Sequence, residues 1–560
     1  MNASSGDPSP LYPQPPVRDV LLRVALLLDE PAVPAWIARI VQEIQASGFC
    51  EVSLAIVGAK SNDGADTPRN SFLYNAYLRN EIRRRRSSQS AFLERDLSEV
   101  LTDTKWLRVI PRRDKDKICL APGDLQKVRD GRPDVLLRFG FRGELCAELI
   151  SAARHGVWMF GHGNNPETAF DSNYLRSIEQ GDPVSASELW QLPPTLEAPR
   201  LLYRSLGSTH PHSLEIGQEI ACRKSSAFVM RCLRQLAATG RIALVQPQTP
   251  PARRPLPGNL EMARFLARNV AYKAGALIRN HTSVEHWSVL WRKGRLLDPD
   301  TPAFADVRTV PCPQGHFYAD PFIFRHQGRD WLFVEDYDYA RGHADIAVIP
   351  WGEQGPAEAA RTVLRLPEHL SYPHVFAWND AVYMVPEIGD AGGPVRLFRA
   401  RNFPDDWELI AELLSGHLAV DATLHEHRGR WYLFANIAPI GGSENDELFL
   451  FHAETPLGPF APHPQNPVVS DARHARPAGR LFTRAGRLIR PSQDCAGGYG
   501  RAVVFNEVLA LDPEHYRERS IGRLEPSPSQ ARKGYHTYAC LDDFEVVDFK
   551  QPKLRWSVGA

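Results

Sequence analysis

Charged residues begin several aromatic, strand-like segments in the second half of this 560-residue chain. The segment "HFYADPFIF", residues 316–324, places Asp320 and a proline inside an otherwise apolar run. Proline cannot donate a hydrogen bond to a sheet, so the pair marks either a strand start or a carboxylate that points into a cavity. A carboxylate in a cavity could accept a proton or attack an electrophilic carbon. The choice depends on whether the pattern repeats along the chain.

The pattern does repeat, in hairpins of two aromatic strands joined by a turn at Gly or Asp. Such hairpins recurring at about 50 residues are typical of four-stranded propeller blades. We therefore predict an all-β five-bladed propeller over residues 283–553, whose ring is closed by a strand within 285–294. The three clearest copies are "DPFIFRHQGRDWLFVE", "YPHVFAWNDAVYMVPE" and "DATLHEHRGRWYLFAN", and looser copies begin at residues 476 and 536.

The innermost strands of a propeller face a central channel, so equivalent positions should form a ring around it. A first ring comes from the starts of the repeats and a second from the strand after each turn. Burying several carboxylates together is costly unless they are paired, hydrated or used, which favours a polar ligand site over a water-filled structural channel. The first ring is Asp320, Tyr372, Asp421, Arg476 and His536; the second is Glu335, Glu387, Asn436 and Gln493.

Two or three converging carboxylates suit the chemistry of a glycosidic bond. One acid must stay protonated to assist the leaving oxygen, while another stays ionised to activate water or attack carbon. Burial and like charge raise one pKa, and a nearby arginine lowers another. We predict Asp320, Glu387 and Asp421 as the catalytic set. The predicted substrate-binding residues are His316, Tyr372, Arg476, Asp494, His536 and Glu335, and sugar-facing aromatic rings could come from Phe317, Tyr318, Tyr372 and Tyr499.

Two families resemble this half of the chain. "YADPFIF" with the later "VDATL" is similar to the five-bladed furanosidase-type glycoside hydrolases, and the resemblance implies that Asp320 is the base or nucleophile and that Asp421 orients the site or tunes its pKa values. The segments "LSYPHVF", "YMVPE", "ARPAG" and "RPSQDC" more closely resemble the N-terminal domain of plant glucosamine inositolphosphorylceramide transferases and their bacterial relatives.

The first half of the chain alternates strand and helix signals. "DVLLRVALLLD" is an apolar run of the kind buried in a parallel sheet, and "PAWIARIVQEIQASG" has helical periodicity. We predict a Rossmann-like α/β domain over residues 19–245, including a helix over "GELCAELISAARHG". The chain is thus multidomain. Its remaining predicted segments are a disordered lead-in at 1–18, a Pro-rich linker and helix at 246–282, and a tail at 554–560.

The segment "PDVLLRFGFRGELCAELISAARHGVWMFGHGN" resembles the formyltransferases of methionyl-tRNA and sugar amines. The resemblance implies a strand–helix–strand unit that ends in Asn-x-His. His162 matches the histidine of that motif, but Phe160 occupies the asparagine position. The resemblance therefore predicts a degenerate site, with a folate formyl donor as cofactor only if formyl transfer is retained.

Composition excludes several classes of protein. Lys+Arg and Asp+Glu both number 66, so no global basic field exists to attract nucleic acid. The eight cysteines have no zinc-ligand spacing, and we predict neither a metal nor another cofactor. No apolar run is long enough to span a bilayer, and the N-terminus lacks the apolar core of a signal peptide. We predict a cytoplasmic protein and leave its oligomeric state open.

Three functions remain compatible with these patterns. The first is a carbohydrate-active protein that hydrolyses or transfers a glycosidic bond of a glycan or glycoconjugate in intracellular polysaccharide or glycolipid metabolism. The second is a formyltransferase-like enzyme acting on an amino sugar, and the third is a non-catalytic glycan-binding or assembly protein. The carboxylate rings favour the first function, and the missing asparagine counts against the second.

Overall fold

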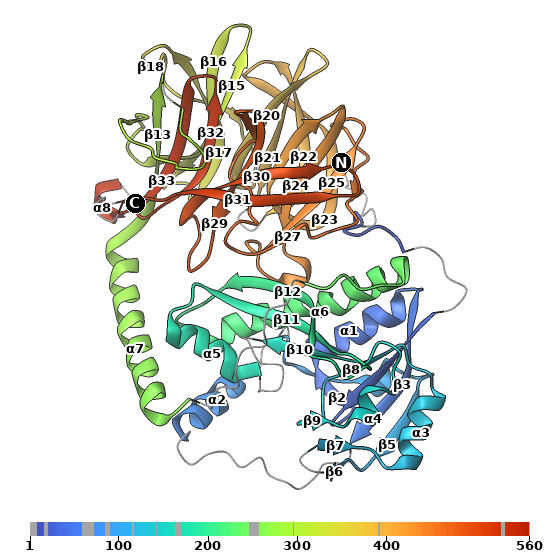
Figure 1. Ribbon diagram of the computed structural model, residues 1–560. Coiled ribbons are helices and arrows are strands. Elements are labelled where there is room, and N and C mark those ends of the chain that lie inside the picture. Colours follow the sequence, from blue (N-terminus) through green and yellow to red (C-terminus); the bar gives the residue numbers. More distant parts are fainter. Residues whose placement is uncertain are drawn as a thin grey trace. The chain divides into compact units, whose positions relative to one another are not determined.

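The chain divides into two compact units, each with its own hydrophobic cores (Figure 1). The first unit comprises the N-terminal residues up to Pro13, Lys273–Pro439 and Ser443–Ala560, and the second comprises Gln14–Tyr272 and Ile440–Gly442. The computed structural model describes residues 8–15, 21–58, 72–84, 90–114, 117–141, 143–162, 170–245, 257–294, 296–389, 392–527 and 532–558.

The described residues of the first unit form five successive antiparallel sheets, two of which share the long strand β23 (Asp406–His427). The first half of β23 pairs with β22 and the second half with β24. The sheets are, in chain order, β15 (His316–His326), β16 (Arg329–Asp338), β17 (His343–Gly352), β18 (Gly355–Pro356) and β19 (Arg361–Leu364); β20 (Leu370–Trp378), β21 (Ala381–Ile388), β22 (Gly393–Asn402) and β23; β23, β24 (Arg430–Ile437), β25 (Glu447–Ala453), β26 (Ala461–Pro462) and β27 (Val469–Ser470); β28 (Phe482–Arg484), β29 (Arg487–Asp494), β30 (Ala502–Leu511) and β31 (Tyr516–Leu524); and β32 (Gly534–Leu541), β33 (Phe544–Leu554), β13 (Ser283–Lys293) and β14 (Arg308–Thr309).

These five sheets pack as a closed ring. A separate cluster of buried apolar side chains lies between each sheet and the next, including the fifth and the first. Strand β13 pairs with β33 along its whole length, so a strand that precedes the first repeat completes the last sheet. This pairing confirms the predicted closing strand, and the unit is a five-bladed propeller.

The innermost strands of four blades are irregular at the position where the repeat begins. The pairing register shifts between Ala319 and Phe322 in β15, and the same shift recurs in β20, β23 and β32. Asp320 and Asp421 have φ angles of 47° and 51°, which are uncommon for residues other than glycine. Residues in such a bulge make no ladder hydrogen bond to the next strand. Pro321, which has no N–H to donate, is therefore tolerated beside Asp320.

The second unit contains a seven-stranded sheet in the order β12-β11-β10-β8-β1-β3-β5. The five strands from β10 to β5 pair in parallel, whereas β11 and β12 are antiparallel to their neighbours. The strands are β1 (Leu22–Leu28), β3 (Cys50–Gly58), β5 (Lys105–Val109), β8 (Val135–Arg138), β10 (Val157–His162), β11 (Val184–Leu192) and β12 (Arg200–Ser208).

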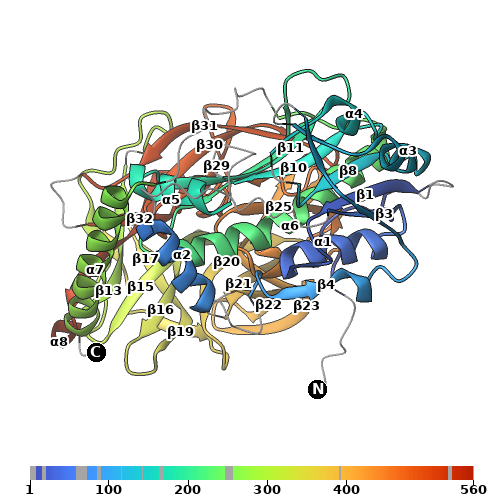
Figure 2. The ribbon, with the colours of Figure 1, turned by 90° about the horizontal axis from the view of Figure 1, so that it is seen from below.

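Apolar side chains on both faces of this sheet are covered by helices. Helices α1 (Ala35–Ala46) and α6 (Leu214–Thr239) lie side by side and pack on one face (Figure 2). Helices α3 (Pro122–Asp130) and α4 (Ala147–Ile150) pack on the other face. The other elements are α2 (Phe72–Arg84), α5 (Phe170–Gln180), α7 (Asn259–Thr282), α8 (Arg555–Val558), the 3-10 turns η2 (Leu97–Glu99) and η3 (Pro439–Gly441), and the short strands β2 (Ala32–Pro34), β4 (Glu94–Asp96), β6 (Arg112–Asp114), β7 (Lys117–Cys119) and β9 (Glu144–Leu145).

Helix α4 is much shorter than the helix predicted over residues 143–156. The start of that segment forms β9, which pairs with β7, so only one helical turn remains before the chain enters β10. Among the described residues, none of the helices is long and apolar enough to cross a membrane.

The predicted N-terminal lead-in makes specific contacts in its described part. The Ser9 N–H donates to the Ser415 carbonyl at 3.0 Å, and the Asn466 side chain donates to the Leu11 carbonyl at 3.1 Å. The Tyr12 ring lies edge-on to Phe449 with centroids 6.1 Å apart. These residues therefore pack on the propeller, whereas we had predicted a disordered segment. Residues 1–7 and 16–18 of the predicted lead-in and residues 246–256 of the predicted linker lie outside the described residues.

Candidate functional site

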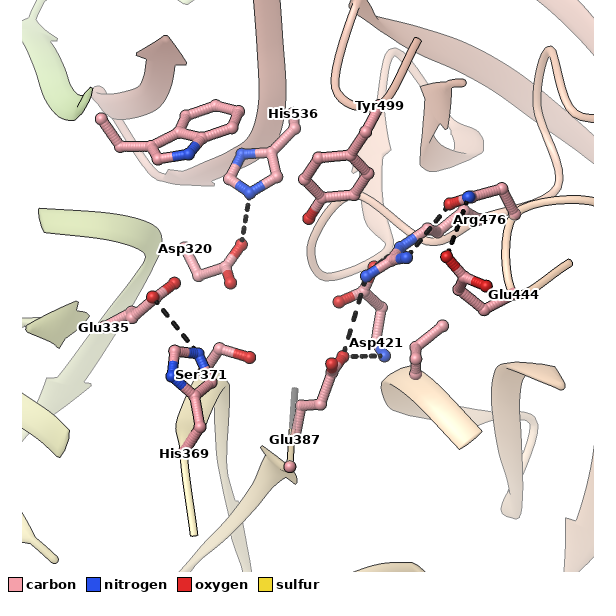
Figure 3. Close-up of a pocket in the computed structure, with 14 residues that line it drawn as sticks. Asp320, Glu335, His369, Ser371, Glu387, Asp421, Glu444, Arg476, Tyr499 and His536 are labelled. Carbon is pink, nitrogen blue, oxygen red and sulfur yellow. Dashed lines mark hydrogen bonds and ion pairs between the residues drawn. The ribbon is translucent and has the colours of Figure 1, made fainter. Parts of the chain in front are cut away.

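A cavity of about 320 Å³ lies at the centre of the propeller and receives side chains from all five blades (Figure 3). Its lining is rich in carboxyl groups, with one arginine and two histidines among them. The lining residues are Trp287, Asp320, Glu335, His369, Ser371, Glu387, Gly389, Val420, Asp421, Glu444, Asn445, Arg476, Tyr499 and His536.

The cavity brings together most of the residues that the repeats singled out. Glu335 and Glu387 stand opposite Ala319 and Ser371 in the strand ladders, immediately before the bulges of the inner strands. The bulges and the adjoining second-strand positions therefore supply the carboxyl groups from both rings. The residues from the predicted set that line the cavity are Asp320, Glu335, Glu387, Asp421, Arg476 and His536.

Asp320 is buried and held by hydrogen bonds on both carboxylate oxygens. It accepts from the Thr537 hydroxyl at 2.5 Å and from the Tyr372 N–H at 3.2 Å. Burial raises its pKa to about 6; the Asp421 and Asp548 charges act in the same direction, and His536 opposes them. Asp320 is thus mostly ionised at neutral pH, yet it can take up a proton.

His536 lies between two carboxylates. Its Nε2 is 3.4 Å from Asp320 Oδ1, and its Nδ1 is 2.6 Å from Asp548 Oδ1. Burial lowers the pKa of the imidazole, but the Asp548 and Asp320 charges outweigh burial and raise this pKa above its ordinary value. The Trp287 ring stacks on the imidazole with centroids 4.0 Å apart, which keeps it in place.

Arg476 organises the other side of the cavity. Its Nε lies 2.6 Å from Asp421 Oδ2, and the Gln493 amide donates to the same oxygen at 2.8 Å. The Asp421 N–H donates to Glu387 Oε2 at 2.8 Å, and that oxygen lies 3.9 Å from Arg476 Nη2. The Arg476 guanidinium also lies over the Tyr499 ring, 4.8 Å from its centroid.

Two glutamates have strongly raised pKa values. Burial and then the Asp421 charge raise the pKa of Glu387 well above its ordinary value, although Arg476 opposes them. Burial and the surrounding carboxylates, Asp320 foremost, do the same to Glu335, whose Oε1 lies 3.5 Å from His369 Nε2. The cavity therefore combines an aspartate whose pKa is about 6 with two glutamates whose pKa values are raised well above their ordinary range.

Tyr372 does not line the cavity, although we predicted that it binds substrate. Its side chain is buried, its hydroxyl accepts the Gly479 N–H at 2.7 Å, and that hydroxyl lies 2.8 Å from the Thr423 hydroxyl. Tyr372 thus links its own blade to the third and fourth blades. The serine before it, Ser371, faces the cavity instead.

Replacing Tyr372 by phenylalanine should lower the stability of the propeller by about 1–3 kcal/mol, because the buried Gly479 N–H loses its acceptor. Calorimetric unfolding would measure the loss, with Tyr383→Phe in the same blade as the matched control. Glycan binding should stay unchanged. A loss of binding with unchanged stability would instead restore Tyr372 as a substrate ligand.

His316 and Asp494 do not line the central cavity either, contrary to our prediction. His316 lies four residues before the bulge, and its Nδ1 is 2.8 Å from Asp336 Oδ1. Asp494 is buried and paired with Arg523, and it accepts the Ala496 N–H at 2.8 Å. The neighbouring Gln493 reaches Asp421 because alternate residues of a strand point to opposite sides.

Of the predicted aromatic rings, Tyr499 lines the cavity, whereas Phe317 and Tyr318 are buried in apolar clusters. The cavity also contains residues that we did not predict. Glu444 and Asn445 lie between β24 and β25, where no repeat signal exists. His369, Ser371 and Trp287 also line the cavity, from positions that the repeat did not single out. Asp548 does not line the cavity, but its carboxylate contacts His536 beside it. The repeat does not predict Asp548, because the fifth-repeat counterpart of Glu335 is Phe549, opposite Tyr535.

Two groups of side chains in the described part of the chain have the spacing to hold a metal ion, and the members of the group beside the cavity are already engaged. Ligand atoms of Asp320, His536 and Asp548 all lie within 4.8 Å of one another. The Asp548 oxygens accept the backbone N–H groups of Asp320 at 2.9 Å and Thr537 at 2.8 Å. We therefore describe the three as an ion-pair triad and assign no metal to it.

The position of His162 is as predicted, at the carboxyl end of β10, and its side chain lies outside the described residues. Phe160, at the position where the formyltransferase resemblance calls for asparagine, is partly buried. Its ring lies 5.1 Å from Trp36 and 6.1 Å from Phe139, measured between centroids. An aromatic cluster thus occupies the place where a polarising amide would be needed.

The sequence of the propeller is similar to that of a family of plant proteins. The family described as "Glucosamine inositolphosphorylceramide transferase 1, N-terminal" matches residues 303–548, which confirms that part of the resemblance. Glucosamine inositolphosphorylceramide transferase 1 of Oryza sativa subsp. japonica is 38% identical over 207 residues, covering 36% of this chain and 28% of the relative. The Arabidopsis thaliana protein of the same name is 34% identical over 228 residues, covering 40% and 29%. The chain thus spans less than a third of the length of these relatives.

Among solved structures, a family 117 glycoside hydrolase of Zobellia galactanivorans is similar at 14% identity and a TM-score of 0.30, covering 49% of this chain and 92% of that structure. The assignment of a propeller rests on the strand pairing described above and not on this likeness.

Proposed function

We propose that the propeller cavity binds a sugar of a glycan or glycoconjugate and hydrolyses or transfers its glycosidic bond. The observation that carries the proposal is the difference in pKa between carboxyl groups that line the same cavity. Asp320 has a pKa of about 6, whereas burial and neighbouring charge raise the pKa values of Glu387 and Glu335 well above their ordinary range. Pairs of acids whose environments separate their pKa values are characteristic of glycosidic chemistry.

In this proposal Glu387 donates its proton to the glycosidic oxygen while the bond between that oxygen and the anomeric carbon breaks. Asp320 either takes a proton from the attacking water or acceptor hydroxyl, or attacks the anomeric carbon itself. Asp421 does not react; it holds Arg476 and, through its N–H, the Glu387 carboxyl group. The Tyr499 ring offers a face to the apolar side of the sugar.

The charge of the cavity restricts the substrate. The lining contains five carboxyl groups but only one arginine. Such a lining favours a neutral or cationic sugar and disfavours a phosphate group close to the carboxylates. The names of the plant relatives include glucosamine and inositolphosphorylceramide, which supports an amino sugar or a glycolipid as the class to test first.

The proposal predicts a bell-shaped pH dependence of kcat/KM on aryl glycosides. Activity should fall below about pH 6 as Asp320 becomes protonated, and should fall again at higher pH as Glu387, whose pKa is raised, loses its proton. Glu387→Gln should remove this second, high-pH limb and should spare substrates with good leaving groups, which need little protonation. A panel of aryl glycosides of graded leaving-group pKa would measure both effects.

Equal losses across that panel in Glu387→Gln would rule out Glu387 as the proton donor, and Glu335→Gln is the matched comparison. If the wild-type protein binds glycans but turns over none of the panel or a glycolipid pool, the non-catalytic binding function replaces the enzymatic one. Cytoplasmic location stays a prediction.

We also propose that the second unit is a Rossmann-like domain, which the parallel strand order β5-β3-β1-β8-β10 and the helices on both faces support. We expect no formyl transfer, because Phe160 belongs to an aromatic cluster. Calorimetric binding of a folate formyl donor, together with formylation of an amino sugar, would reverse this expectation.

A further inference from the structure

Helix α7 carries an apolar stripe that is exposed to solvent. Leu260, Val270, Leu277 and Ile278 are 62–69% exposed. Its apolar residues recur every three or four positions, which places them on one face of the helix. The buried residues of α7 lie on the opposite face: Met262, Phe265 and Asn269. The members of the stripe are Leu260, Ala263, Ala267, Val270, Ala274 and Leu277, with Ile278 beside them.

Basic side chains border this stripe. Arg264 and Lys273 flank it, and Arg268 and Arg279 lie further round the helix; all four are exposed. Glu261 is the one acidic residue in the sequence of α7. The helix is thus strongly basic in a chain whose formal net charge is zero.

An exposed tryptophan lies at the C-terminal end of α7. The Arg555 guanidinium of α8 donates to the Asn280 carbonyl at 3.1 Å, which ties α8 to this end of α7. The next residue, Trp556, is 78% exposed, and Leu554 is 46% exposed. Indole rings are enriched where protein meets the polar–apolar boundary of a membrane.

We propose that α7, together with Trp556, docks flat on an anionic lipid surface. An exposed apolar stripe with a basic border and a tryptophan is the pattern of a helix that lies in the membrane interface. Pairing with a second copy of α7 would place Arg264 and Lys273 at the flanking positions, where like charges repel. The proposal goes beyond the proposed function and does not depend on it.

Because the stripe contains three alanines, the apolar contribution should be modest and binding should be reversible. The basic residues should then contribute a large, salt-sensitive share of the affinity. We expect the full-length protein to float with vesicles of phosphatidylcholine and phosphatidylserine, to bind phosphatidylcholine vesicles at least about tenfold more weakly, and to be released by salt.

The test compares two double variants of exposed apolar pairs. Leu277→Glu with Ile278→Glu should reduce vesicle binding at least about tenfold, because it places two carboxylates against the lipid. Leu409→Glu with Ile410→Glu is the matched control; these residues lie on the propeller strand β23 and are 53% and 39% exposed. The control should bind like the wild type, and melting temperatures would show that both variants are folded.

Three outcomes would overturn the proposal. The first is failure of the wild-type protein to bind anionic vesicles, and the second is equal binding by the two double variants. The third is a dimer, detected by sedimentation, that only Leu277→Glu with Ile278→Glu dissociates while vesicles remain unbound; this outcome would assign the stripe to a second copy of the chain. None of these results bears on turnover of aryl glycosides at the propeller.

Discussion

Replacing Asp320 by asparagine should lower turnover of any glycoside that the protein processes by about a thousandfold or more, because a base or nucleophile is removed rather than weakened. The amide has nearly the same shape and keeps one acceptor oxygen for the Thr537 hydroxyl, although the Tyr372 N–H loses its acceptor. Some stability should therefore be lost, while folding and glycan binding should survive. Steady-state kinetics on the aryl glycoside panel would measure turnover, and calorimetry would measure glycan affinity separately.

Asp494→Asn is the matched control for this variant. Asp494 is also a buried aspartate of the propeller, but it pairs with Arg523 away from the cavity. We expect Asp494→Asn to lower the melting temperature while the folded protein keeps its turnover. Full activity of Asp320→Asn would end the glycosidic mechanism and leave glycan binding as the function of the cavity.

Replacing Arg476 by methionine should destabilise the propeller by about 3–5 kcal/mol. The arginine and Asp421 side chains are only 8% and 3% exposed, so the variant leaves a buried carboxylate without its cation. The variant also removes the hydrogen bond to Asn445 Oδ1 at 3.1 Å and the contact with the Tyr499 ring. Calorimetric unfolding of the propeller transition would measure the loss of stability.

The double variant Arg476→Met with Asp421→Asn supplies the control, because it removes the unpaired charge together with its partner. We expect the double variant to be clearly more stable than Arg476→Met alone, as coupling within a buried pair requires. If Arg476→Met cost less than about 1 kcal/mol, the pair would have to behave like a hydrated surface ion pair, and the low-dielectric cavity assumed here would be wrong.

The repeat of aromatic hairpins predicted the propeller correctly, and with it the residues that face its centre. The prediction worked because a blade is a local unit: its strands and turns are consecutive in the chain, so their pattern is readable without knowing what packs against them. Asp320, Asp421, Arg476 and His536 were therefore found from spacing alone. The closing strand β13 followed from the same argument, since a ring needs a partner for its last sheet.

Errors arose where the direction of a side chain depends on the bulge and on its length. Tyr372 shares the positive φ of Asp320, but its long side chain reaches the third and fourth blades instead of the cavity. In β29, Gln493 of the predicted second ring contacts Asp421, whereas Asp494, which we predicted to bind substrate, pairs with Arg523 instead. Helix α4 was overestimated because the pairing of β9 with β7, which joins separate segments, outweighed the helical pattern.

By itself, the sequence determined the number of blades, their order and four of the five acids that line the central cavity, because these follow from local periodicity. Only the tertiary structure decided in which direction, and by which neighbours, the pKa of each acid is shifted. Burial, the Arg476–Asp421 pair and the His536–Asp548 contact set the pKa values of Asp320 and Glu387, and these partners come from different blades. Electrostatic energies depend on distance and solvent exposure, which no spacing along the chain encodes.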